Sequence, residues 1–127
     1  RNISNEMLAR ADAASGEHRT WFRKALDAGV EMALGSDLGP IKEAVHLEMG
    51  LWVRNGASPI QALKAATITS AKVCGIDNDL GSVETGKIAD LIVVRDNPLE
   101  NINHLRTLLM VLKDGRIITN RLESRSS

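Results

Sequence analysis

Asp37 is the residue in this sequence whose position best suits catalysis. It follows the apolar run at residues 30–34 and two small residues, Gly35 and Ser36. The run is typical of a buried β-strand, and in a parallel barrel the carboxyl end of each strand opens onto the active site. A carboxylate there can contact a metal ion or transfer a proton. The other interpretation is an acid that stabilises a turn or the start of the next helix.

The three histidines and two nearby acids are weaker candidates. His18, His46 and His104 are spaced too widely for two imidazoles to share one face of a helix and bind a metal ion together. We expect His46 to lie on a helix surface or behind the site, and the other two histidines to be solvated. Glu43 and Glu48 could line the mouth of a site, but acids on a helix with a charged face are more often surface residues.

Two further polar residues are expected to be structural. Cys74 is the only cysteine, which excludes an internal disulfide and a disulfide-built secreted scaffold. Its position at a helix end between Val73 and Gly75 favours a buried, unreactive thiol. Asp90 lies in an apolar β run, and we expect it to bond to nearby backbone.

Composition narrows the class of protein. A chain of 127 residues with 43% hydrophobic content is long enough for a real core but too short for a complete barrel, which takes about 250 residues. Lys and Arg together number 16, and Asp and Glu together also number 16, so the formal net charge is zero. We therefore expect no nucleic-acid partner and no membrane partner. No signal-peptide pattern occurs, and we expect a cytoplasmic protein. The first residue is not Met, which favours a piece of a longer polypeptide.

Hydrophobic periodicity predicts mainly helices before residue 76 and strands after it. The expected helices cover about residues 4–16, 17–28, 41–54, 58–66 and 67–74. Ser58, Pro59 and Gln61 form the pattern of a capping box, which should start the fourth of them. The expected strands are residues 30–34, 91–94, 109–112 and 116–119. Asp114-Gly115 joins the last two as a hairpin turn.

Three sequence blocks follow these elements in order. They are Gly35-Ser36-Asp37, the segment 56–71 with Ser58-Pro59 and Ala66-Thr67, and the segment 81–91, which combines glycines, an acid, Lys87 and Ala89-Asp90-Leu91. This arrangement resembles the carboxyl-terminal third of the metal-dependent amidohydrolase superfamily, in the branch of imidazolonepropionase-like and Xaa-Pro dipeptidase-like enzymes. The resemblance covers about residues 16–115, and the segment 81–91 is its most specific part.

The resemblance implies a fold of the α/β class. The chain would be the C-terminal part of a (β/α)8 TIM-type amidohydrolase barrel plus the C-terminal strands of a small β-sandwich domain. Residues 1–75 would form the end of the barrel, and residues 76–127 would belong to the composite sandwich. Asp37 would then lie at the end of the eighth strand.

The resemblance also implies a chemistry. Asp37 would be both a metal contact and the general base that takes a proton from the attacking water, in an enzyme that hydrolyses a C–N bond of a small molecule such as a dipeptide or acyl-amino acid. The cofactor would be a divalent metal, zinc being the expected one, as one or two ions. The expected partners are the remainder of the barrel, the small-molecule substrate and further copies in a homo-oligomer.

The sequence departs from the family pattern in its ligands. The His-x-His pair, the carboxylated lysine and the two later metal histidines of the family have no counterpart in these residues, so most ligands would lie outside this segment and the segment alone should be inactive. Two alternatives stay open. One is a deaminase or a cyclic-amide (imidazolone-type) hydrolase of the same superfamily, and the other is a non-catalytic assembly module without a complete site.

Overall fold

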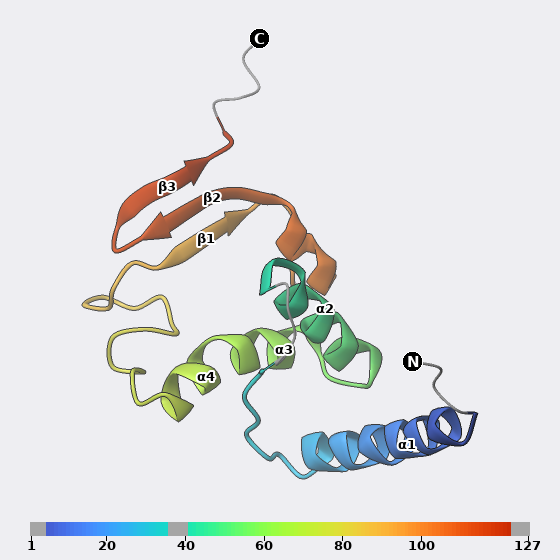
Figure 1. The fold of residues 1–127 in the computed structure, drawn as a ribbon. Helices are drawn as coiled ribbons and strands as arrows, with labels where there is room; N and C mark the ends of the chain where they lie inside the picture. The colour runs from blue at the N-terminus through green and yellow to red at the C-terminus, as the bar shows by residue number, and fades with distance from the viewer. Residues whose placement is uncertain (1–4, 36–40, 123–127) are drawn as a thin grey trace.

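A computed structural model describes residues 5–35 and 41–122, with the surroundings of the side chains for 15–35 and 43–122. Helices come first along this part of the chain, and a small antiparallel sheet follows (Figure 1). The elements in order are α1 (Asn5–Asp27), α2 (Ile41–Arg54), α3 (Pro59–Ala66), α4 (Ile68–Val73), β1 (Leu91–Val94), the 3-10 helix η1 (Ile102–Arg106), β2 (Leu108–Lys113) and β3 (Arg116–Asn120). None of the described helices is long and apolar enough to cross a membrane.

The first helix is continuous, and the predicted break at Gly16 is wrong. α1 passes through Gly16, whose carbonyl oxygen accepts a hydrogen bond of 3.1 Å from Thr20 Oγ1. A glycine in a helix interior costs only about 1 kcal/mol relative to alanine, which the flanking turns offset. The helix instead ends before Gly29, at φ 71°, where the chain leaves it.

The predicted strand at residues 30–34 is also wrong. Residues 30–35 have no regular secondary structure. A strand exists only when its amides pair with a neighbouring strand. Here the amide of Leu34 donates instead to the carbonyl of Ala65 in α3, at 3.1 Å. The apolar run correctly predicted that Leu34 packs against the core. No strand among the described residues pairs with residues 30–34.

The helices that follow agree with the sequence patterns. α2 has the predicted bounds, and α3 begins at a complete capping box. Ser58 Oγ accepts a hydrogen bond from the amide of Gln61 at 3.3 Å, and the amide of Ser58 donates to Gln61 Oε1 at 2.8 Å. Thr67 precedes α4 but does not cap it, since its hydroxyl donates to the Leu63 carbonyl at 2.7 Å.

The sheet is a meander in the order β1-β2-β3, with both pairs antiparallel. The predicted hairpin is confirmed: β2 and β3 are joined by Asp114 and Gly115, both at positive φ, 50° and 73°. Before the sheet, the loop from Gly75 to Asp90 packs on α4. Gly81 is required there, because a Cβ on it would lie 2.8 Å from Ala71 Cβ and 2.9 Å from Ile68 Cα.

The core is small and lies where α2, α3 and η1 meet. Its buried members are Met49, Ala62, Ile102 and Leu105, and Leu34 and Trp52 are among the half-buried residues packed against them. Phe22 of α1 joins from the side, with its ring edge-to-face on Trp52 at 5.0 Å between centroids. The 3-10 helix η1 thereby ties the chain segment that carries the sheet to the helices.

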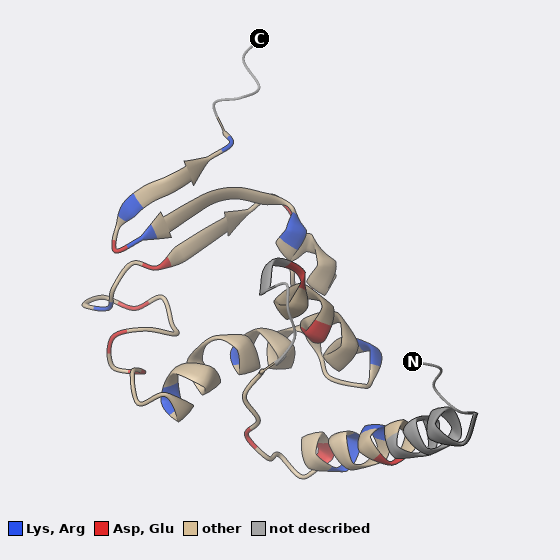
Figure 2. Cartoon of the chain, in the orientation of Figure 1, with Lys and Arg blue, Asp and Glu red and all other residues tan. Residues whose placement is uncertain are grey.

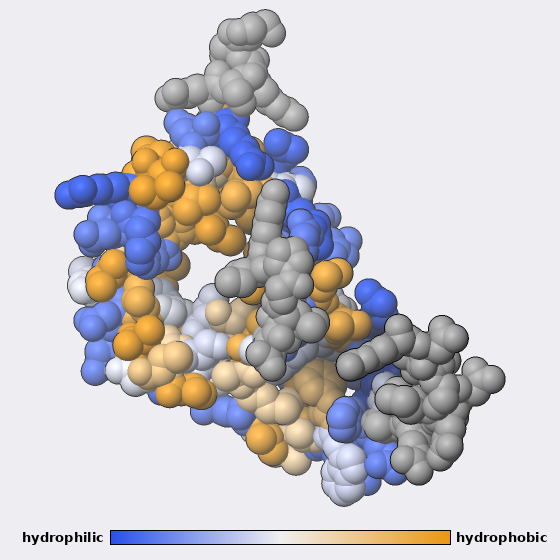
Figure 3. All heavy atoms as spheres, in the orientation of Figure 1, coloured by the Kyte–Doolittle hydropathy of each residue, from blue (hydrophilic) through white to orange (hydrophobic). Residues whose placement is uncertain are grey.

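Both faces of the sheet remain partly exposed. Ile92 and Val93 are neighbours on β1 and point to opposite faces, yet they are 54% and 41% exposed. Ile117 and Ile118 of β3 also point to opposite faces, and they are 57% and 64% exposed. Figure 3 shows hydrophobic side chains gathered over the strands, and Figure 2 shows the charges scattered in both signs over the helices, the loop and the strand ends.

Candidate functional site

Asp37, the predicted catalytic and metal-contacting residue, lies outside the described residues. Its position is bracketed by two segments that the structure does describe. Gly35 precedes it by two residues, and α2 begins four residues after it, at Ile41. The described part of the candidate site consists of these flanks and the residues that hold them.

Each of the four α-helices holds part of the segment at residues 30–35, and two of these contacts lie at its start. The amide of Val30 donates to the carbonyl of Ala25 in α1 at 3.0 Å. Glu31 pairs with Lys72 of α4 at 3.2 Å. Both of these side chains are exposed, so this ion pair contributes little stability by itself.

The contacts at the end of the segment are more direct. The amide of Leu34 donates to the carbonyl of Ala65 in α3 at 3.1 Å, and the next amide, that of Gly35, donates to Glu48 Oε1 of α2 at 3.2 Å. Two successive backbone amides are thus held by two different helices. The backbone is therefore held at Gly35, two residues before Asp37 in the sequence.

Glu48 differs from the surface acid that we expected. The residue is half-buried, its Oε1 accepts the Gly35 amide, and its Oε2 is buried with no hydrogen-bond partner among the described residues. The spacing of residues in α2 indicates that Glu48 is half-buried. Glu48 lies four residues after buried Ala44 and four before Trp52, so the three share one stripe of α2 that faces the core.

The second acid, Glu43, is held by an ion pair. Its Oε2 accepts a hydrogen bond of 2.6 Å from Arg106 Nη1, which links α2 to η1. Glu43 and His46 also line a hollow of about 400 Å³ between α2 and the sheet, together with Ile92, Leu105, Arg106, Leu108 and Arg121. His46 is half-buried there, so it is a helix-surface residue that faces a hollow rather than open solvent.

The other two histidines have separate surroundings. His18 is exposed, as expected. The prediction that His104 is solvated is wrong, because the residue is half-buried and its Nδ1 lies 2.8 Å from the carbonyl oxygen of Asn97. This contact closes the loop before η1, which local sequence spacing does not reveal. Neither imidazole takes part in a metal-binding group among the described residues.

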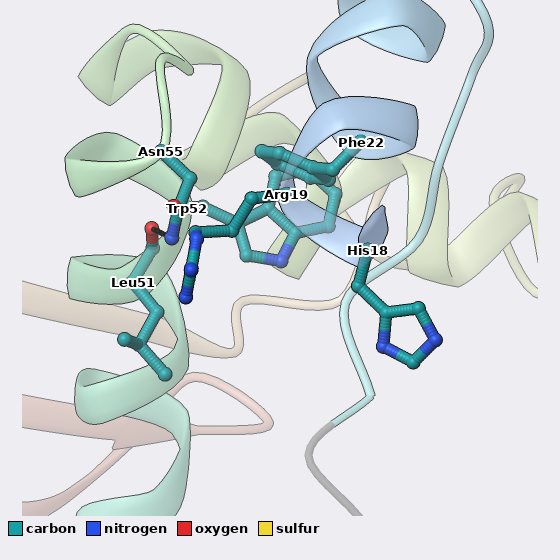
Figure 4. A pocket seen from close by; sticks show the side chains of 6 residues that line it. All are labelled: His18, Arg19, Phe22, Leu51, Trp52 and Asn55. Carbon is teal, nitrogen blue, oxygen red and sulfur yellow. Dashed lines mark hydrogen bonds between the residues drawn. The ribbon is translucent and has the colours of Figure 1, made fainter. Parts of the chain in front are cut away.

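A second hollow lies between α1 and α2 (Figure 4). It has a volume of about 180 Å³ and is lined by His18, Arg19, Phe22, Leu51, Trp52 and Asn55. The amide side chain of Asn55 is held by the Leu51 carbonyl at 2.8 Å. None of the lining residues is an acid, so this hollow offers no carboxylate as a general base.

Two further expectations about polar residues have opposite outcomes. Asp90 is structural, as predicted: its Oδ2 accepts from Lys113, and its Oδ1 accepts from the Asp114 amide at 2.8 Å. The Lys113 hydrogen bond, followed by the Asp114 amide, lowers the pKa of Asp90 below its ordinary value. The prediction that Cys74 is buried is wrong, because this thiol is exposed at the end of α4, where the chain turns away at Gly75.

Lys87 is the one cation of the loop from Gly75 to Asp90, and its contacts are also structural. Its side chain is 13% exposed, and Nζ donates to the Asp77 carbonyl and to Ser82 Oγ, both at 2.6 Å. The Ser82 hydroxyl in turn donates to Glu84, and this bond together with the charge of Lys87 lowers the pKa of Glu84. The segment at residues 81–91 therefore contains a loop that the contacts of Lys87 hold together.

The described side chains do not form a metal centre by themselves. Within residues 15–35 and 43–122, no three His, Cys, Asp or Glu side chains come together. Catalytic zinc typically needs three protein ligands and an open position. The described residues alone therefore do not fit a metal ion, and a site would require ligands from outside them.

Comparison with known proteins places the chain in a family. A profile of the amidohydrolase family matches residues 1–118. Ochratoxinase of Aspergillus niger is 35% identical over 102 residues, which are 79% of this chain and 21% of that enzyme. Imidazolonepropionase of Geobacillus kaustophilus is 34% identical over 108 residues, 77% of this chain and 25% of that enzyme.

The solved structures that the chain resembles agree with this family. A Xaa-Pro dipeptidase with methionine bound in its active site matches with a TM-score of 0.73 and 40% identity, over 80% of this chain and 25% of that one. The chain thus spans about a quarter of the length of the relatives that it matches. With residues 1–118 matched, it belongs to the amidohydrolase family, which is generally metal-dependent.

Proposed function

We propose that the chain is the C-terminal portion of a metal-dependent amidohydrolase that hydrolyses an amide-like C–N bond of a small substrate, with Asp37 as its general base. The observation that supports this most is the anchored end of the segment at residues 30–35. Hydrogen bonds from Leu34 and Gly35 to two helices hold the backbone immediately before an acid that the family match includes.

The proposed role of Asp37 is to move one proton twice. Its carboxylate accepts a proton from the attacking water as the water oxygen bonds to the carbonyl carbon, and then gives that proton to the leaving nitrogen as the C–N bond breaks. One divalent metal, zinc by our proposal, would supply the acidity of that water when bound. Asp37 would be this chain's contribution to its ligands, the others lying elsewhere in the protein.

The proposal includes the surroundings of the chain. Residues 1–75 would be the end of a (β/α)8 barrel, and residues 76–127 would be part of a small β-sandwich. The exposed Ile92 and Val93 on opposite faces of β1 support this, because aliphatic side chains on both faces of a strand are typical of a sheet that is covered on both faces. The remainder of the barrel and sandwich is the partner that we propose, within a homo-oligomeric enzyme.

The relatives suggest which substrates to test. One is named for Xaa-Pro dipeptides, one for ochratoxin and one for an imidazolone. A dipeptide or an acyl-amino acid is the substrate class that we propose. A methionyl-proline dipeptide, an N-acyl amino acid and imidazolone propionate form a panel that separates this class from cyclic-amide hydrolysis.

The test is turnover of the full-length protein with Asp37 replaced. Asp37→Asn and Asp37→Ala should lower kcat on the panel substrate by at least ~100-fold, the usual contribution of a positioned acid–base group. Circular dichroism should show the fold unchanged. Asp79→Asn, a change at an exposed acid of the loop after α4, is the matched control and should keep kcat. Retention of kcat by both Asp37 variants would rule out the proposed base.

A further inference from the structure

We infer that Glu48 is a positioning residue for Asp37. By this inference, the carboxylate of Glu48 fixes the backbone two residues before the general base and so sets where that base lies. The inference rests on the proposed function of Asp37, and it assigns to α2 a part in the site that goes beyond packing.

The first support is the hydrogen bond itself. Glu48 Oε1 accepts from the Gly35 amide at 3.2 Å across thirteen positions of the sequence. The side chain projects from the middle of α2, beside Met49, which is 4% exposed. A carboxylate on a packed helix is a stiff anchor, because its own backbone cannot move without disturbing the core.

The second support is that the neighbouring amide is anchored too. Leu34 donates to the carbonyl of Ala65 in α3, so the chain is held by both helices within two residues. α2 and α3 pack through Met49 and Ala62 in the shared core. From Gly35, the chain can reach only about 7 Å to the Cα of Asp37, since consecutive Cα atoms are ~3.8 Å apart. The Gly35 anchor therefore limits the space in which Asp37 can lie.

The third support is the chemistry of the residue. Glu48 Oε2 is buried with no hydrogen-bond partner in the described part of the chain, and a buried polar atom without a partner is unfavourable. A methionine would fill the same space without burying an oxygen. Methionine could not accept the Gly35 amide with comparable strength, however. A glutamate therefore suits this position because of its acceptor, not because of packing.

The decisive variants are Glu48→Met and Glu48→Gln in the full-length protein. The first keeps the length of the side chain and removes the acceptor without opening a cavity. The second keeps an amide oxygen that can accept the same hydrogen bond. Glu100→Gln, at an exposed acid before η1, is the control. Three quantities are measured: the melting temperature, kcat and KM for methionyl-proline, and hydrogen exchange at the Gly35 amide by mass spectrometry in the metal-free protein.

We expect Glu48→Met to lower kcat by about 10- to 100-fold, because a misplacement on the order of 1 Å can reduce a rate by that much. KM should stay within about twofold, since substrate binding is not the function assigned to Glu48. The Gly35 amide should exchange faster, and the melting temperature should not fall. Glu48→Gln should restore both slow exchange and most of kcat. A purely structural glutamate would instead lower the melting temperature and leave kcat alone.

Two results would overturn the inference. One is wild-type kcat and wild-type exchange in Glu48→Met, and the other is a Glu48→Gln variant as defective as Glu48→Met. Asp37→Asn separates this outcome from failure of the proposed function. If Asp37→Asn retains full kcat, the assigned base is wrong, whereas exchange at Gly35 still reports whether Glu48 holds the segment. If Asp37→Asn is inactive and Glu48→Met is not, only the positioning role fails.

Discussion

Met49→Ala should destabilise the protein by about 3 to 4 kcal/mol. Met49 is 4% exposed and lies in the cluster that joins α2, α3 and η1. Truncation removes about three methylene-sized groups, worth about 2.4 kcal/mol at ~0.8 kcal/mol each. A remaining cavity of roughly 50 Å³ would add about 1.2 kcal/mol at ~24 cal/mol per Å³.

Urea unfolding followed by tryptophan fluorescence measures this loss, since Trp52 packs against the cluster and should report its exposure. Met49→Leu is the matched control, because a volume-conserving change in a core usually costs less than about 1.5 kcal/mol. A loss below about 1 kcal/mol for Met49→Ala, or equal losses for both variants, would show that the three elements do not depend on this cluster.

The remaining predictions concern Ser58, which caps α3, and Asp90, which lies directly before β1. Ser58→Ala should cost about 1 kcal/mol by removing the side-chain acceptor for Gln61, whereas Ser58→Asp should cost less, and urea unfolding compares the two. Lys113 and the Asp114 amide lower the pKa of Asp90 in the folded protein. The ionised Asp90 therefore stabilises the fold above the ordinary aspartate pKa of ~3.9, and this stabilisation is lost as the pH falls through the lower folded pKa. Asp90→Asn should therefore destabilise the protein more at pH 7 than at pH 3, and an equal effect at both would contradict the assignment.

Features encoded by neighbouring residues could be predicted from the sequence. The Ser58 capping box needs only residues three positions apart, and Asp114-Gly115 specifies its turn through two positive φ values. The bounds of α2 followed from an uninterrupted apolar pattern. Such signals are local, so the rest of the protein does not change them.

The errors arose where the outcome depends on distant residues. The run at residues 30–34 has strand character, but its pairing partner is not in the described chain, and α3 takes the Leu34 amide instead. The exposure of Cys74 depends on whether another element covers the end of α4. Asp37 was predicted from the residues before it and from the family blocks, and its role stays a prediction because it lies outside the described residues.

Glu48 is the clearest example of a residue whose burial depends on distant residues. Its charge led us to expect a surface residue, whereas its place in the stripe with Ala44 and Trp52 is one that faces the core. These two indications conflict on a helix alone. They agree once the Gly35 amide lies against the carboxylate, because one oxygen of the half-buried acid, Oε1, then has a donor. Only the tertiary contact decides between them.

The position of bound metal relative to Asp37 tests the central claim most directly. Crystals of the full-length protein grown with zinc should give an anomalous peak about 2.0–2.2 Å from a carboxylate oxygen of Asp37, the distance of a zinc–carboxylate bond. A zinc ion with a complete set of protein ligands that leaves Asp37 out of contact, in a protein that still hydrolyses methionyl-proline, would contradict the account.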